Sequence, residues 1–132
     1  MKHLVVIDTN VIVSSIFSPS GNPFRVMELV ASEAIKPFYS SAILEEYKRV
    51  LAYPKFKFRS EIQSRTIQTI KRLGKQIEPP NSTIPLPDET DRIFYDTAKA
   101  INGTLITGNM KHYPAEPFIM TPADFLTSIW LT

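Results

Sequence analysis

The 132-residue chain contains no cysteine, which excludes disulfide bonds and thiolate metal sites. Its two histidines, His3 and His112, are too few for a histidine-based zinc site without help from carboxylates. No stretch approaches the roughly 20 apolar residues that a transmembrane helix needs, and no export signal precedes the first apolar run, so we expect a cytoplasmic protein without membrane contact. Any chemistry of this chain must therefore rest mainly on oxygen groups.

The net charge at pH 7 is only +2, but the charged residues are unevenly distributed along the chain. Residues 1–47 and 76–132 are net acidic, whereas residues 48–75 hold nine Lys and Arg residues and a single acid, Glu61. A cationic segment between acidic flanks is typical of a nucleic-acid contact beside a metal site. A solvated helix face is the alternative interpretation.

Strand and helix signals alternate along the chain, which at this length is expected to be a single domain spanning residues 1–132. The expected strands are residues 4–7, 35–39, 104–107 and 118–120, and the expected helices are 22–32, 41–53, 60–77, 88–101 and a last one from about 122. Ser60 and Gln63 form a predicted capping box. This alternation predicts a three-layer α/β/α fold with a mainly parallel central sheet.

Acidic and amide side chains follow the ends of these strands. Asp8 ends the apolar run Leu4–Ile7, where a lone carboxylate is costly unless it binds a cation or a donor. Parallel strands place their carboxyl ends, and the helix starts that follow, on one edge of a sheet. The other residues expected at that edge are Glu45, Glu46, Asp88, Asp91 and Asn109. Oxygen ligands without Cys or His favour a hard cation, Mg²⁺ or Mn²⁺.

Each acid also has a purely structural interpretation. Asp8 could cap the following helix, and Asp91 could complete a capping box begun by Asp88. Glu45 and Glu46 compete for one role, because adjacent helical residues point about 100° apart and only one can face the site.

Four motifs together resemble the PIN-domain family over residues 4 to about 120. They are Asp8-Thr9-Asn10 after an apolar strand, Glu46 at the start of residues 46–51, Asp91 within residues 87–94, and Leu105-Ile106-Thr107-Gly108-Asn109. The resemblance assigns the helical glutamate to Glu46 and the third acid to Asp91, which leaves Asp88 as the helix cap. The residues themselves suggest that Asn10 orients Asp8 through a hydrogen bond without binding metal, and that Thr107 does the same from its strand end.

The resemblance implies a metal-dependent ribonuclease that is commonly the toxin of a toxin–antitoxin pair. Asp8, Glu46 and Asp91 would hold Mg²⁺ or Mn²⁺ with help from Asn109. The implied partners are an RNA substrate, an antitoxin protein and further copies of the chain in a homodimer or higher homo-oligomer. The residues expected to contact RNA are Lys48, Arg49, Lys55, Lys57, Arg59 and Lys111.

The main departure from the family pattern is Asn109, because many PIN domains carry an aspartate there. The amide removes one negative charge and predicts weaker cation binding. Residues 107–114 resemble a variant that recurs in one subgroup of PIN-domain toxins, so we interpret Asn109 as a modification of the site. Within the same segment, the loop histidine His112 is expected to be inert, and a role as general acid–base is the alternative.

Two other functions remain open at this stage. An RNA-binding PIN-fold module with a degenerate site is supported by Asn109 alone. A haloacid-dehalogenase-like phosphatase also places an aspartate after its first strand, but it requires a second aspartate where this chain has Asn10, and a later lysine without a matching context here. Phe56 and Phe58 alternate with cations and could stack on bases, although core packing is the favoured interpretation.

Overall fold

The computed structural model describes residues 3–130 as five parallel strands with helices on both sides. The strands are β1 (His3–Ile7), β2 (Ile35–Tyr39), β3 (Lys75–Gln76), β4 (Thr104–Ile106) and β5 (Ile119–Met120). They lie in the order β3-β2-β1-β4-β5, and every paired neighbour is parallel. The predicted parallel α/β/α architecture is confirmed, and β1, which ends in Asp8, occupies the centre of the sheet.

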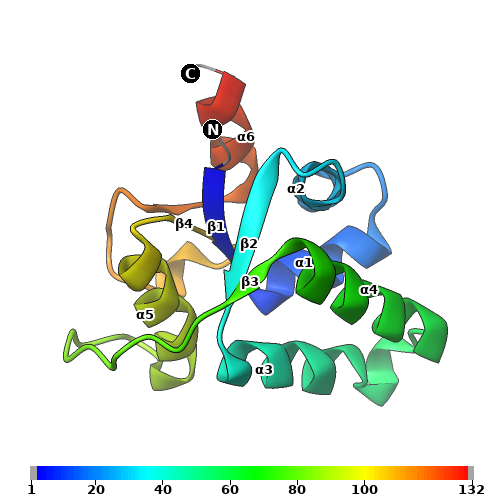
Figure 1. Cartoon of the computed structure of the whole chain (residues 1–132), viewed down its shortest axis with the longest axis horizontal. Helices are drawn as coiled ribbons and strands as arrows, with labels where there is room; N and C mark the ends of the chain where they lie inside the picture. The colour runs from blue at the N-terminus through cyan, green and yellow to red at the C-terminus, as the bar shows by residue number, and fades with distance from the viewer. Residues whose placement is uncertain (1–2, 131–132) are drawn as a thin grey trace.

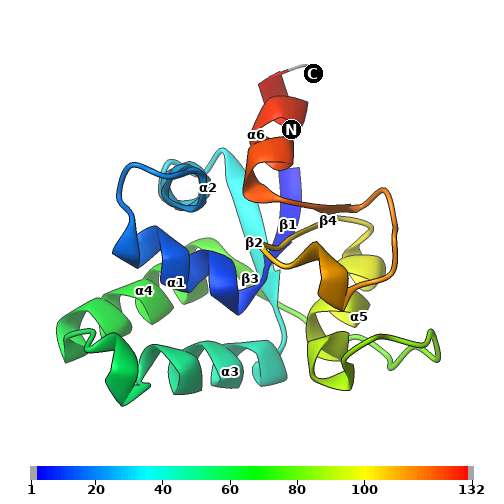
Figure 2. The same cartoon turned by 180° about the vertical axis from the view of Figure 1, so that it is seen from behind.

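The helices form the outer layers of the fold. They are α1 (Thr9–Phe17), α2 (Asn22–Ala31), α3 (Ser41–Leu51), α4 (Ser60–Leu73), α5 (Arg92–Ile101) and α6 (Pro122–Trp130). In Figures 1 and 2, α5 covers one side of the sheet, α1, α2 and α4 cover the other, and α3 runs below it. None of the helices within residues 3–130 is long and apolar enough to span a membrane.

Strand β3 is absent from the sequence prediction, which continued the preceding helix to Ile77. Helix α4 instead ends at Leu73, and Lys75 and Gln76 pair with Phe38 and Tyr39 of β2. Gly74 permits the change of direction, because a Cβ atom there would lie 2.4 Å from the Pro37 carbonyl oxygen. The apolar spacing around Ile77 therefore reflects burial beside the sheet and not a continued helix.

The predicted capping box at the start of α4 is also wrong in its details. The N-cap residue is Arg59, and its side chain makes no capping hydrogen bond. Gln63 Nε2 donates to the Phe58 carbonyl oxygen at 2.9 Å, so the side chain ties the helix to the preceding segment. The helix forms as expected, but its first turn is held by Gln63 and not by Ser60.

The proline-rich segment before α5 is fastened to that helix by Arg92. This guanidinium donates to the carbonyl oxygens of Ser82 (2.9 Å) and Ile84 (2.7 Å) and forms two hydrogen bonds with Glu89. Asp96, one turn further along α5, accepts from the Ser82 backbone amide at 3.0 Å. These contacts fix the approach to the short 3₁₀ turn η2 (Glu89–Asp91), at which two of the predicted site acids lie.

The close approach of Gly74 to β2 makes a test of the fold. We expect Gly74→Ala to destabilise the protein by about 2 kcal/mol, because the new methyl group meets the backbone oxygens of Pro37 and Ile70. Urea denaturation followed by circular dichroism measures the change. Gly21→Ala is the matched control, since its Cβ meets nothing closer than 3.4 Å. Equal losses in the two variants would contradict the packing described for Gly74.

Candidate active site

Asp8 lies immediately after β1, at the carboxyl edge of the sheet, and its side chain is buried. Although Asp8 occupies the N-cap position of α1, its side chain makes no capping hydrogen bond. Its Oδ2 instead accepts from the hydroxyl groups of Thr107 (2.8 Å) and Tyr113 (2.9 Å). Burial raises the pKa of Asp8, and these two donors only partly oppose the effect. The capping interpretation of Asp8 is therefore not supported.

Thr107 connects Asp8 to the turn that follows β4. Its hydroxyl donates to Asp8 and accepts from the backbone amide of Asn109 at 3.0 Å. Asn10 Oδ1 accepts from the backbone amide of Gly108 at 2.9 Å. The Asn10 side chain thus stabilises the turn that carries Thr107 and Asn109, whereas its backbone amide hydrogen-bonds to the Asp8 carboxyl and lowers the pKa of that group. The two supporting residues named by the sequence lie together.

Glu46 projects from α3 toward the same edge. Its Oε2 accepts from the Thr9 hydroxyl at 2.5 Å, and its Oε1 lies 3.7 Å from Arg49 Nη2. Burial raises the pKa of Glu46, and repulsion from Asp8 and Asp88 adds to the increase. The neighbouring Glu45 is exposed and pairs with Lys48 on the surface. The helix register thus turns Glu46, and not Glu45, toward Asp8.

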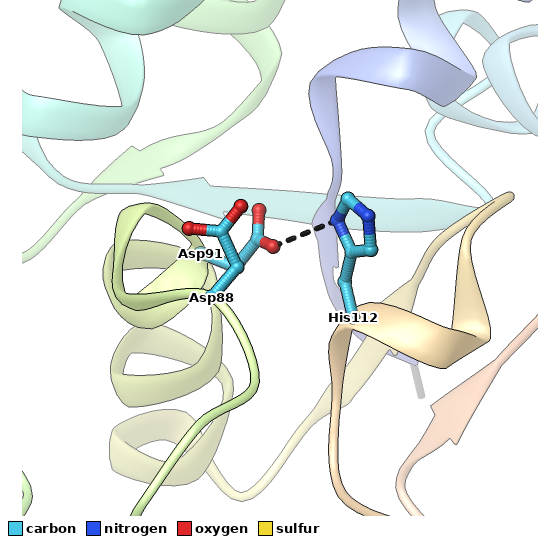
Figure 3. Close-up of side chains that lie close together, drawn as sticks. All are labelled: Asp88, Asp91 and His112. Atoms are coloured by element: carbon cyan, nitrogen blue, oxygen red, sulfur yellow. Dashed lines mark hydrogen bonds and ion pairs between the residues drawn. The ribbon is translucent and has the colours of Figure 1, made fainter.

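Asp88 and Asp91 divide the capping and site roles as the sequence indicates. Asp88 Oδ1 accepts from the backbone amide (2.9 Å) and hydroxyl (2.7 Å) of Thr90, so it caps the η2 turn. Asp91 makes no capping hydrogen bond, and its Oδ2 lies 3.0 Å from His112 Nδ1 (Figure 3). Burial and repulsion from Asp8 raise the pKa of Asp91 to about 6, against the influence of His112.

The structure gathers these acids loosely and adds a histidine. Within residues 3–130, the one group of three metal-capable side chains whose ligand atoms all lie within 4.8 Å of one another is Asp88, Asp91 and His112. Asp8 and Glu46 lie outside this tight group, but their charges act on its members and on each other. Several carboxylates with pKa values raised by burial and mutual repulsion form a donor set that suits a divalent cation.

Three hydroxyl groups of the site were not identified from the sequence. Thr9 binds Glu46, and Tyr113 binds Asp8 from a loop without regular structure. Tyr47 is fully buried and donates to the Ile7 carbonyl oxygen at 2.5 Å, directly before Asp8. Thr9 lies within the Asp8-Thr9-Asn10 motif, which could have pointed to it. Tyr47 belongs to the apolar stripe of α3, and Tyr113 lies within residues 107–114, whose resemblance to a family variant could have pointed to it.

The residues predicted to contact RNA are all exposed, and most lie near the connection between α3 and α4. They are Lys48, Arg49, Lys55, Lys57, Arg59 and, on a separate 3₁₀ turn η3 (Met110–His112), Lys111. Of the two phenylalanines, Phe58 packs against the core, whereas Phe56 does not. Both rings contact Phe17 at the end of α1, Phe56 edge-on and Phe58 at a tilt, and Phe17 is 57% exposed. Core packing thus accounts for only one of the pair.

Comparison with known proteins identifies the family of this chain. A family model described as "PIN domain" matches residues 4–111, and the chain belongs to the PIN-domain family. The uncharacterized protein MJ1680 of Methanocaldococcus jannaschii is 29% identical over 112 residues, covering 83% of this chain and 72% of that protein. The crystal structure of VapBC2 from Rickettsia felis, bound to a DNA fragment from its promoter, contains a similar fold. It aligns with a TM-score of 0.53 and 20% identity over 82% of this chain and 89% of that chain.

The raised pKa values predict that the site costs stability when no cation is bound. Because folding raises the pKa of Asp8, ionised Asp8 destabilises the folded protein at pH 7 relative to the unfolded chain. We expect Asp8→Asn to raise the melting temperature in EDTA by roughly 3 °C, equivalent to about 1 kcal/mol. Differential scanning calorimetry measures the shift.

Asp88→Asn provides the control, because its hydrogen bonds to Thr90 lower the pKa of Asp88 and its charge is favourable. We expect no increase in melting temperature for this variant. A decrease in the melting temperature of Asp8→Asn would contradict this expectation, because it would show that the hydrogen bonds of the Asp8 carboxylate outweigh the cost of burying its charge.

Proposed function

We propose that this PIN domain is a metal-dependent endoribonuclease. The observation that carries the proposal is the convergence of Asp8, Glu46 and Asp91 from three separate segments. Burial raises the pKa of all three, and repulsion from Asp8 and Asp88 adds to the increase for Glu46 and Asp91. Perturbed carboxylates gathered at the carboxyl edge of a parallel sheet are typical of a functional site. The PIN family, whose members are generally nucleases, supports hydrolysis of phosphodiester bonds.

Asp8, Glu46 and Asp91 would hold Mg²⁺ or Mn²⁺. When bound, such a cation lowers the pKa of a coordinated water and neutralises charge on a phosphate. The protein's own contribution is orientation: Thr107 and Tyr113 fix one oxygen of Asp8, and Thr9 fixes one oxygen of Glu46. Asn109 leaves the site one negative charge short of an all-carboxylate arrangement, which predicts weaker but retained cation binding.

A continuous series of contacts leads from the acids to the cationic segment. Arg49 pairs with Glu46 and donates to the Tyr53 hydroxyl at 2.6 Å, and Lys55 Nζ lies 5.9 Å from the Tyr53 ring and 5.3 Å from the Phe56 ring. Helix α1 carries Phe17 about 12 Å from the site. Cations alternating with partly exposed aromatic rings suit a single strand, whose phosphates and unstacked bases are both available.

The same proposal includes an RNA substrate, a toxin role with an antitoxin partner, a homodimeric or larger assembly and a cytoplasmic location. The VapBC complex whose fold is similar supports the toxin–antitoxin assignment as an analogy. The phosphatase interpretation loses its support, because the chain belongs to the PIN family and Asn10 is engaged with Gly108. The next experiment distinguishes a nuclease from a module that binds RNA without cleaving it.

Two adjacent glutamates test the proposed activity. We expect Glu46→Gln to reduce Mn²⁺-dependent cleavage of a fluorescent single-stranded RNA at least 100-fold, since it removes a charge that faces Asp8. Glu45→Gln is expected to cleave like the wild type, because Glu45 is exposed and pairs only with Lys48. EDTA should abolish cleavage by the wild type and by Glu45→Gln. RNA binding without turnover in the wild type, or cleavage in EDTA, would refute the nuclease proposal.

The cations near the α3–α4 connection provide a second test. We expect the triple variant Lys55→Gln/Lys57→Gln/Arg59→Gln to weaken RNA binding and to reduce the slope of log K against log salt by about 2. Fluorescence anisotropy in EDTA measures binding without turnover. The control removes three exposed cations of α4 instead: Arg65→Gln/Lys71→Gln/Arg72→Gln. The same loss of slope in both triple variants would show that only the total charge matters.

A further inference from the structure

His112 is more constrained than an inert loop histidine. Its side chain is 45% exposed, yet both ring nitrogens have partners: Nδ1 lies 3.0 Å from Asp91 Oδ2, and Nε2 lies 2.9 Å from Asn109 Nδ2. The η3 turn holds the residue as well, since the His112 backbone amide donates to the Asn109 carbonyl oxygen at 3.1 Å. The imidazole is thus fixed in one orientation at the edge of the acidic site.

The orientation directs Nδ1 toward the carboxylates. Figure 3 shows the ring facing Asp88 and Asp91 across the gap between η2 and η3. A ligand atom of each of these three side chains lies within 4.8 Å of the other two. This proximity suits a single ion shared by the three groups. Asp91 belongs to this group and also to the acid set proposed above.

We propose that His112 is a further metal ligand, which binds through Nδ1 the same divalent cation as Asp91. The inference rests on the proposed metal-dependent function and extends its ligand set from oxygen to one nitrogen. The ring nitrogen adds a donor atom to a site from which Asn109 has removed a charge. The imidazole also brings selectivity, because Mn²⁺ accepts a nitrogen ligand more readily than Mg²⁺, which requires near-ideal octahedral coordination by oxygen.

Asn109 can serve both states of the imidazole. Its Nδ2 lies 2.9 Å from Nε2. In the tautomer in which Nε2 accepts from this amide, Nδ1 carries a proton and donates it to Asp91. Ligation through Nδ1 requires this proton to reside on Nε2, where the Asn109 carbonyl oxygen accepts it after the amide rotates by half a turn. An ionised aspartate at position 109 could only accept. The amide therefore stabilises the metal-free and the ligating tautomer in turn.

The test is electron spin-echo envelope modulation on the full chain loaded with Mn²⁺. The wild type is expected to show the ¹⁴N modulation of a directly bound imidazole, and labelling with ¹⁵N-histidine should change its frequencies without any substitution. Only two histidines occur in the sequence, so the control is simple. His3→Gln should retain the signal, since His3 lies at the start of β1 against Phe125. His112→Gln should abolish it.

Affinity provides the second readout. We expect His112→Gln to weaken Mn²⁺ binding roughly tenfold by isothermal titration while changing Mg²⁺ binding much less. Mn²⁺ bound to the wild type without nitrogen modulation, but lost in Asp91→Asn, would overturn the role of His112 and leave the proposed nuclease intact. Failure of the wild type to bind either cation would overturn both proposals.

Discussion

Two hydroxyl groups far along the chain, on Thr107 and Tyr113, donate to one buried oxygen of Asp8, and the rest of the site depends on this junction. They lie 99 and 105 residues from Asp8 in the sequence. The hydrogen bonds join the end of β1 to the turn after β4, which also carries Asn109 and His112. Without them a buried carboxylate would have too few partners in the interior. The junction therefore fixes both the position and the charge of the first acid.

The charge of Asp8 affects the pKa values of the two neighbouring acids. Asp8 raises the pKa values of Glu46 and Asp91 by repulsion, and burial acts in the same direction on all three. Arg49 and His112 are the cationic or protonatable groups that oppose these increases. A site with this electrostatic balance is destabilised while its acids are ionised, and the divalent cation of the proposed function would relieve this repulsion, which links the packing of the fold to the proposed chemistry.

Sequence reasoning identified the fold because burial and turn chemistry are local signals in this chain. The run Leu4–Ile7 reads as a central strand, and β1 is the centre of the sheet. The same reasoning missed β3, because two exposed residues carry no periodic signal and Gly74 ends α4 through a contact with Pro37 of another strand. It also misplaced the first turn of α4, where Gln63 and not Ser60 supplies the hydrogen bond.

The site was predictable to the extent that topology gathers strand ends. Parallel strands explain why acids that follow strand ends meet at one edge, so the sequence by itself determined this edge and its acidic character. The choice of Glu46 and Asp91, and the missing charge at Asn109, came from the resemblance to the PIN-domain family. The tertiary structure alone decided which atoms meet: that Asp8 binds Tyr113, that Glu46 binds Thr9, and that His112 faces Asp91. These contacts join residues far apart in the chain. A hydrogen bond forms only when donor and acceptor are placed to within a few tenths of an ångström, and residue types and spacing do not specify positions that closely.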